Sequence, residues 1–211
     1  MKPVIFHRLL FCDKVITEIY SRSKDKETIM AKLNTGDKLP SFTFDTHLRD
    51  GLDSLSVLRG KTVFWVLRYI GCTVCRYDVH LIAQRYDEFT AKGAQVFVVM
   101  QSDRDHVQKD LAATDTVLPF EIICDPDQKI YDLLSIEPAE SMEALAGGNR
   151  DALMEKGAKA RECGFSHGDY EGNEQQLPAM FIVAEDGTVE YAHYAENIVD
   201  MSTVDGVLRM L

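Results

Sequence analysis

The chain has 211 residues, 45% of them hydrophobic and 27% charged, a composition typical of a single globular domain. Its formal net charge of −11 excludes the basic surface that nucleic-acid binding needs, and anionic membranes would repel it. Five cysteines are an odd number and argue against a secreted disulfide framework, and only Cys72 and Cys75 are close together. We therefore expect a cytoplasmic protein without nucleic-acid or membrane partners, in which this pair serves catalysis or metal binding.

The first 29 residues differ in charge from the rest of the chain. They carry six basic and four acidic side chains, a balance of +2, which leaves −13 for the remaining residues. His7 and Arg8 interrupt the early apolar runs and no small-residue cleavage site follows, so a secretory signal is not supported. Two interpretations stay open. In the first, Met30 is the physiological start and residues 1–29 are not native. In the second, residues 1–29 form a short appended helix before a domain spanning 30–211.

Three segments in the first half of the chain predict strands. Residues 41–44 alternate polar and apolar side chains, as a half-buried strand does. Residues 62–67 form a continuous β-branched and aromatic run, which is typical of a central parallel strand buried on both faces, and residues 94–100 repeat this pattern. The order of these segments predicts the core of an α/β sheet.

Helical patterns separate the strands. Ile82, Tyr86 and Phe89 recur with the spacing of one helix face until Gly93, which predicts one amphipathic helix directly after the cysteine pair. Ser102 is the expected N-cap of the next helix. The chain thus alternates strand and helix, which favours a parallel sheet.

The second half predicts a strand, a helical insertion and a closing hairpin. We interpret residues 137–176 as an insertion containing a helix at 151–161, followed by a Gly- and His-rich stretch that could shape the rim of an active site. The other predicted elements are a strand at 121–124, a short helix at 130–134, a hairpin of strands at 180–184 and 188–194, and a helix at 204–211. Together the elements predict an α/β fold with a mixed central sheet and helices on both faces.

The cysteine pair lies where a buried strand gives way to a helix. The first turn of a helix offers unpaired amides and the positive end of the helix dipole, which stabilise a thiolate. Two residues between Cys72 and Cys75 let one sulfur resolve a disulfide or sulfenic acid formed on the other. A zinc site is the alternative, with Cys72, Cys75 and His80 as three ligands and Cys124 or His167 recruited from afar. We favour the redox interpretation, since a second close cysteine pair is missing.

The remaining cysteines and histidines show no diagnostic spacing. Cys124 ends an apolar strand and is expected to be a buried small hydrophobe, and Cys163 an incidental surface cysteine. No role is assigned to the histidines at positions 47, 80, 106 and 193.

Several motifs together resemble the redoxins. Residues 36–42, the cysteine pair, residues 124–127 and residues 177–183 with 186–188 occur in the redoxin order. From about Thr35 to Leu211 the chain resembles the alkyl hydroperoxide reductase and thiol-specific antioxidant family, the peroxiredoxin-like branch of the thioredoxin superfamily. The resemblance implies a thioredoxin-like fold, a disulfide or peroxide substrate, and an external thiol or thioredoxin-type reductant with no other cofactor. It also implies that Pro178 is cis and lies beside the two sulfurs.

The chain departs from the peroxide-binding motif of that family. Where peroxiredoxins have proline, threonine and the peroxidatic cysteine, this chain has Arg68, Cys72 and Cys75, and Pro178 stands where the family has an arginine. Fewer donors are then available to polarise an O–O bond. Arg68, Thr73 and Pro178 are the expected supporting residues, and Arg68 either turns toward Cys75 or points into solvent.

Three functions follow from these observations. The first is a thiol-disulfide oxidoreductase in which Cys72 attacks and Cys75 resolves. The second is a thiol peroxidase with Cys75 peroxidatic and Cys72 resolving. The third is a non-catalytic module that binds a metal or a partner. We favour the first, because the threonine and arginine that activate peroxide are missing.

Overall fold

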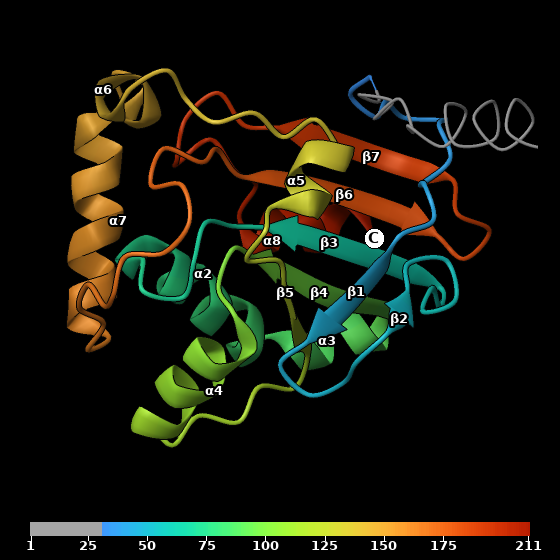
Figure 1. Cartoon of the computed structure of the whole chain (residues 1–211), viewed down its shortest axis with the longest axis horizontal. Coiled ribbons are helices and arrows are strands. Elements are labelled where there is room, and N and C mark those ends of the chain that lie inside the picture. Colours follow the sequence, from blue (N-terminus) through green and yellow to red (C-terminus); the bar gives the residue numbers. More distant parts are fainter. Residues whose placement is uncertain (1–30) are drawn as a thin grey trace, which may run out of the picture. The chain divides into compact units, whose positions relative to one another are not determined.

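The computed structural model of the protein describes residues 31–211, built around a seven-stranded mixed sheet (Figure 1). Its strand order is β2-β1-β5-β4-β3-β6-β7. The strands are β1 Thr43–Thr46, β2 Leu52–Asp53, β3 Lys61–Val66, β4 Ala94–Met100, β5 Glu121–Cys124, β6 Ala179–Ala184 and β7 Val189–Tyr194. The two interpretations of residues 1–29 lie outside the described residues.

The middle of the sheet is parallel and its edges are antiparallel. β3, β4 and β5 run in parallel, with Val63 opposite Val96 and Val99 opposite Ile123. β6 pairs with β3 in the antiparallel sense and continues into β7 through a turn in which Gly187 has φ 82°. All but the first residue of β3 are buried, as its unbroken β-branched and aromatic run predicts.

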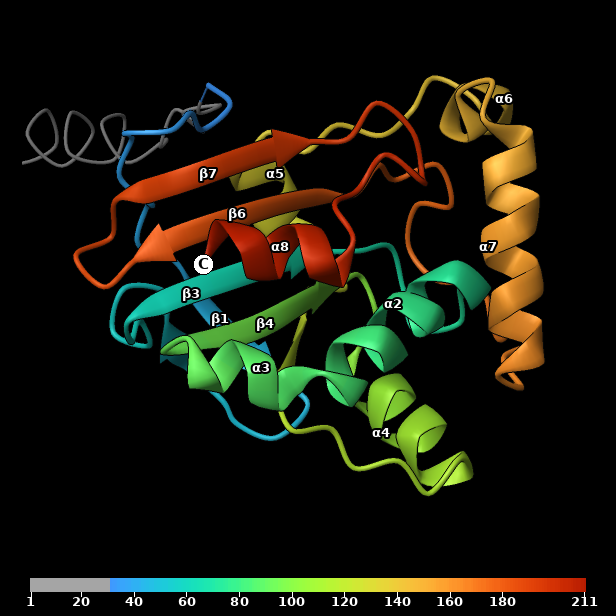
Figure 2. The same cartoon turned by 180° about the vertical axis from the view of Figure 1, so that it is seen from behind.

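Helices cover both faces of the sheet. The helices are α2 Thr73–Gln84, α3 Tyr86–Ala91, α4 Arg104–Ala113, α5 Lys129–Leu133, α6 Met142–Ala146, α7 Arg150–Glu162 and α8 Val204–Met210. α5 lies on one face with Phe64 and Phe97, whereas α3 and α8 lie on the other with Trp65 and Val98 (Figures 1 and 2). α7 packs on the outside of α2. Within residues 31–211 no helix has the length and apolar content needed to cross a membrane.

Two local predictions are wrong. The single helix expected from position 82 to position 93 is broken at Arg85, which has φ −121° and closes α2 with a hydrogen bond from its N–H to Ile82 O. The N-cap of α4 is Asp103, whose side chain accepts from the N–H of His106, and not Ser102. The Ser102 hydroxyl instead accepts a hydrogen bond from Ile70 N at 2.8 Å. Distant partners therefore determine the role of Ser102, whereas the break at Arg85 is a local turn of the backbone.

The parallel strands bring their carboxyl ends to one edge of the sheet. Beyond β3 the chain continues to Arg68, whose carbonyl accepts from Gln101 N just beyond β4. The loop that leads into α2 thus lies beside the start of α4. Open α/β sheets bind ligands at this edge, and the candidate site lies here.

Candidate active site

The two cysteines lie in the turn that joins β3 to α2. Cys72 is the N-cap residue of α2 and Cys75 is in its first turn, which places the two sulfurs 2.8 Å apart. Both are free thiols, since a covalent disulfide measures about 2.05 Å. Each of the two residues is only 2% exposed. The site is a reduced dithiol whose sulfurs are already in contact.

The two thiols differ in acidity. The pKa of Cys72 is lowered to about 6, mainly because Cys75 Sγ–H donates a hydrogen bond to its sulfur; burial opposes this, and the positive charge of Arg68 adds to the lowering. The pKa of Cys75 is raised well above its usual value by burial, and further by its hydrogen bond to Cys72 and the charge there. At neutral pH Cys72 is therefore the thiolate and Cys75 the neutral thiol.

Arg68 is buried and directed at the dithiol. Its side chain is 6% exposed, and Nη1 donates to Cys72 Sγ at 3.7 Å. Nη2 donates to the Tyr69 hydroxyl and to the carbonyl of Glu174, and the guanidinium lies over the Tyr69 ring. The interpretation in which Arg68 points into solvent is wrong, because these acceptors hold its side chain inside. The guanidinium donates to the sulfur of Cys72, whereas the backbone of Arg68 hydrogen-bonds to Cys75.

Residues 163–176, which we call the covering segment, lie against the dithiol loop. Gly168 N donates to Gly71 O at 2.8 Å, and Arg76 Nη1 donates to Ser166 O at 3.0 Å. The approach is so close that a Cβ on Gly71 would lie 2.0 Å from Asp169 O. Since both sulfurs are buried, we infer that a substrate reaches them only after this segment moves.

Aromatic side chains join the covering segment to the loop. The Tyr69 hydroxyl lies 3.3 Å from His167 Nε2, and the His167 ring is 4.3 Å from that of Tyr170, centroid to centroid. Tyr69 is fully buried, which raises its pKa, whereas Tyr170 is 64% exposed. The cluster therefore extends from the dithiol loop to the surface.

The prediction that Pro178 is cis is wrong, because every peptide bond within residues 31–211 is trans. The chain around it is extended. Gln176 pairs with Pro138 as an isolated bridge, and Pro178 O accepts from Ala195 N at 3.1 Å as β6 begins. Pro178 is buried where β6 runs beside β3, but its proximity to the sulfurs stays a prediction. Thr73, the half-buried first residue of α2, likewise keeps a predicted supporting role.

The other cysteines are not placed for reaction with the pair. Cys124 ends β5, and burial raises its pKa to about 12, so it is an inert thiol at neutral pH. Cys163 is exposed at the end of α7. Within residues 31–211, the one group of three or more His, Cys or acidic side chains with converging ligand atoms contains neither cysteines nor His80. The proposed zinc set is therefore not assembled.

Three residues at this edge of the sheet were not predicted from the sequence to belong to the site. Ser102, His106 and Glu171 form a hydrogen-bonded chain that begins at Ile70 N in the dithiol loop. Glu171 lies in a stretch without helical or strand periodicity, and His106 finds its partner 65 residues away. The signal available was the position of Ser102 and His106 directly after a parallel strand, where sites form.

Comparison of this chain with known proteins identifies a matching family profile and a related protein. A sequence profile of the AhpC/TSA family matches residues 35–192. Peroxiredoxin Q, a chloroplastic protein of Populus jackii, is 32% identical over 154 residues, which cover 72% of this chain and 70% of the relative.

Solved structures with a similar fold include two peroxiredoxins. A yeast mitochondrial 1-Cys peroxiredoxin has a TM-score of 0.60 at 16% identity, covering 84% of this chain and 74% of its own. A cysteine-to-serine variant of peroxiredoxin 6 from Arenicola marina has a TM-score of 0.61 at 13% identity, covering 84% and 71%. At these identities they establish a shared fold, and the predicted thioredoxin-like α/β architecture is confirmed.

Proposed function

The chain belongs to the AhpC/TSA family and is a thiol-dependent redox enzyme of peroxiredoxin type, and we propose that Cys72 attacks its substrate while Cys75 resolves the product. The observation that carries this assignment is the difference in acidity between two sulfurs only 2.8 Å apart. A thiolate is the nucleophile in thiol chemistry, and a neighbouring neutral thiol is the group that can resolve. The arrangement favours the first of the three functions expected from sequence.

The proposed cycle needs only the dithiol and an external thiol. The Cys72 thiolate attacks one sulfur of a substrate disulfide, the substrate S–S bond breaks, and the departing thiolate takes up a proton. Cys75 then loses its proton and attacks Cys72 Sγ, releasing the second substrate thiol and leaving a Cys72–Cys75 disulfide. Two electrons have passed to the substrate. An external thiol or thioredoxin-type donor returns them by the same exchange, so we expect no metal or organic cofactor.

Peroxide reduction is the second candidate, favoured by the identity with peroxiredoxin Q. Here the Cys72 thiolate attacks a peroxide oxygen, the O–O bond breaks, and water or an alcohol leaves after taking a proton. The resulting sulfenic acid condenses with Cys75 to give the disulfide and water. Arg68 is a buried cation at the attacking sulfur, but the family's threonine and arginine positions hold Cys72 and Pro178. We therefore propose disulfides as the better substrates.

Trapping of the covalent intermediate tests the assignment of roles. Cys75→Ser should accumulate mixed disulfides between Cys72 and the substrate, because the resolving thiol is missing, whereas Cys72→Ser should not. Both variants are compared with Cys163→Ser, which changes an exposed thiol outside the pair. If Cys72→Ser still consumes peroxide rapidly and forms a sulfenic acid at Cys75, the roles are reversed.

Substrate choice is measured on the same reduced enzyme. Steady-state consumption of hydrogen peroxide and of a protein disulfide should be compared with one thiol reductant, and we expect the disulfide to give the larger kcat/KM. The cytoplasmic location expected from composition is a separate proposal, which the chloroplastic relative makes worth testing by fractionation.

A further inference from the structure

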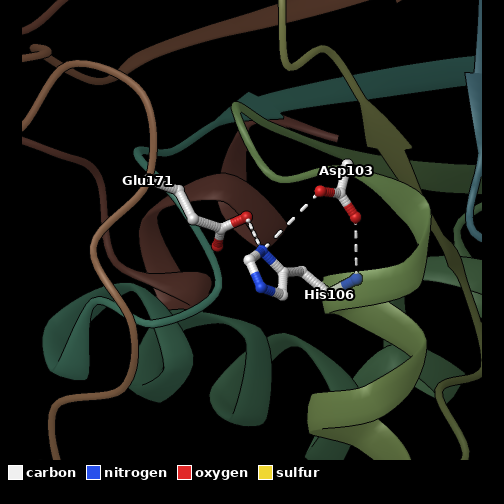
Figure 3. Close-up of side chains that lie close together, drawn as sticks. All are labelled: Asp103, His106 and Glu171. Atoms are coloured by element: carbon white, nitrogen blue, oxygen red, sulfur yellow. Dashed lines mark hydrogen bonds and ion pairs between the residues drawn. The ribbon is translucent and has the colours of Figure 1, made fainter.

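Three side chains converge beside the covering segment without a role in the cycle above. Asp103 caps α4, His106 lies in its first turn, and Glu171 belongs to the covering segment (Figure 3). His106 Nδ1 lies 2.6 Å from Glu171 Oε1 and 3.7 Å from Asp103 Oδ2. We propose that these three residues bind a divalent transition-metal ion, best matched by Zn²⁺, and that the ion fastens the covering segment over the dithiol.

The donor set suits zinc. One imidazole nitrogen and two carboxylate oxygens are three protein ligands, and a water completes a four-coordinate site of the open kind. Bonds of about 2.0–2.2 Å with tetrahedral angles place ligand atoms roughly 3.3–3.6 Å apart. To reach this spacing from His106 Nδ1, Glu171 Oε1 must move away from its present 2.6 Å, and Asp103 Oδ2 must move closer than its present 3.7 Å. All three ligand atoms lie within 4.8 Å of one another, so the two carboxylate oxygens must also reach this spacing from each other.

Hydrogen bonds outside the set orient its ligands. Asp103 Oδ1 accepts from the backbone N–H of His106, which leaves Oδ2 facing the ring. Glu171 Oε2 accepts from the Ser102 hydroxyl at 2.7 Å, which leaves Oε1 facing the ring. The Glu171 side chain is 9% exposed and Ser102 is fully buried, so this half of the site is fixed within the protein. Such outer contacts are a regular part of metal sites.

The charge around the cluster favours a cation. Besides Asp103 and Glu171, the Asp169 carboxylate lies 4.0 Å from His106 Nε2. Arg76 and Lys109 are the positive side chains that line the adjacent cavity of about 160 Å³; the charge of Arg76 is paired with Asp110, and Lys109 is an exposed residue of α4. A metal ion held by His106 would also be bound by both carboxylates, whose negative charges it would offset.

A bound ion would hold the covering segment closed. Asp103 and His106 belong to α4, whereas Glu171 lies in the same segment as Gly168, which bonds to Gly71 of the dithiol loop. If only the closed form binds the ion, zinc at 100 times its dissociation constant lowers the open fraction about 100-fold. Metal binding does not depend on which cysteine attacks, but its effect on turnover rests on the proposed function.

The binding test uses the reduced full chain. Calorimetric titration with Zn²⁺ should show one ion per chain, with affinity at least about tenfold lower in His106→Asn and in Glu171→Gln. Asp105→Asn, an exposed carboxylate on the same helix, is the matched control and should bind like the wild type. Co²⁺ serves as a spectroscopic probe, because thiolate ligands give intense charge-transfer absorption that nitrogen and oxygen ligands do not. A thiolate-type spectrum, no binding, or equal affinity in His106→Asn would overturn the site.

The second test measures closure. Zinc should slow the alkylation of Cys72 by iodoacetamide in the wild type and in Asp105→Asn, but not in His106→Asn. Equal protection in His106→Asn would place the ion on the cysteines and refute the proposal. Zinc that binds at the cluster but leaves alkylation unchanged would refute its closing effect.

Discussion

Replacing Arg68 by methionine removes a positive charge beside the sulfur of Cys72 and keeps a long unbranched side chain. Arg68 Nη1 lies 3.7 Å from Cys72 Sγ, and neither side chain is more than 6% exposed. Unit charges about 4 Å apart interact by about 1 kcal/mol in water and about 4 kcal/mol at an effective dielectric constant of 20. The hydrogen bond from Cys75 lowers the pKa of Cys72 more than Arg68 does. We therefore expect the lower part of this range, about 1.4 kcal/mol, or about one pKa unit.

The expected change in rate reverses with pH. In the wild type Cys72 has a pKa of about 6. Raising it by about one unit lowers the thiolate fraction about tenfold at more acidic pH, but makes each thiolate about threefold more nucleophilic for a Brønsted coefficient near 0.45. The variant should be about threefold slower than the wild type well below pH 6 and about threefold faster well above pH 7. The two profiles therefore cross.

The assay is the pH dependence of Cys72 alkylation, followed by peptide mass. Arg68→Lys keeps a positive charge and should have a midpoint nearer to that of the wild type. A looser covering segment, caused by loss of the contact with Glu174, would raise the rate equally at every pH and leave the midpoint in place. An unchanged midpoint in Arg68→Met would refute the electrostatic role assigned to this residue.

Two further predictions concern access and stability. In Gly71→Ala the new methyl group would meet Asp169 O at 2.0 Å, so the covering segment must shift, and we expect Cys72 to be alkylated about tenfold faster, about 1.4 kcal/mol, at an unchanged pH midpoint. An unaltered rate would show that this segment does not limit access. Lys156→Met leaves the mostly buried Asp78 carboxylate without its partner at 2.7 Å and should lower the free energy of unfolding in urea by about 3 kcal/mol. Because burial already raises the pKa of Asp78 above its unfolded value, the loss should grow as pH rises through the folded-state pKa, and adding Asp78→Asn should restore stability. A loss below about 1 kcal/mol would contradict burial of the pair.

The strands were predictable because their side chains carry the information locally. The run at 62–67 is buried on both faces as β3, and residues 121–124 form β5 with the predicted bounds. Errors occurred where a distant partner decides the outcome. Serine is a common N-cap residue, but the Ser102 hydroxyl hydrogen-bonds to Ile70 and Glu171 instead. Asp103 is therefore the N-cap of α4.

The site was predictable in part for the same reason. The cysteine pair is a local motif, so its place at the start of α2 followed from the sequence. Which way Arg68 points could not follow, because its acceptors include a carbonyl 106 residues away. The covering segment has no periodicity, and its contacts with Gly71 depend on the path of the whole insertion. The expected cis bond at Pro178 came from the family resemblance and not from any feature of this chain.

Because both sulfurs are buried, the reactivity of Cys72 depends on two separate quantities, its ionisation and its exposure to the substrate. The observed rate of the enzyme is the product of the ionised fraction of Cys72 and the fraction of molecules in which it is uncovered. Cys75 and Arg68 lower the pKa of Cys72 and so set the first, and we infer that residues 163–176, which bond to the dithiol loop, control the second. A nucleophile of this acidity would otherwise be open to irreversible oxidation. We therefore expect changes in residues 163–176 to alter access to the dithiol without altering the pKa of Cys72.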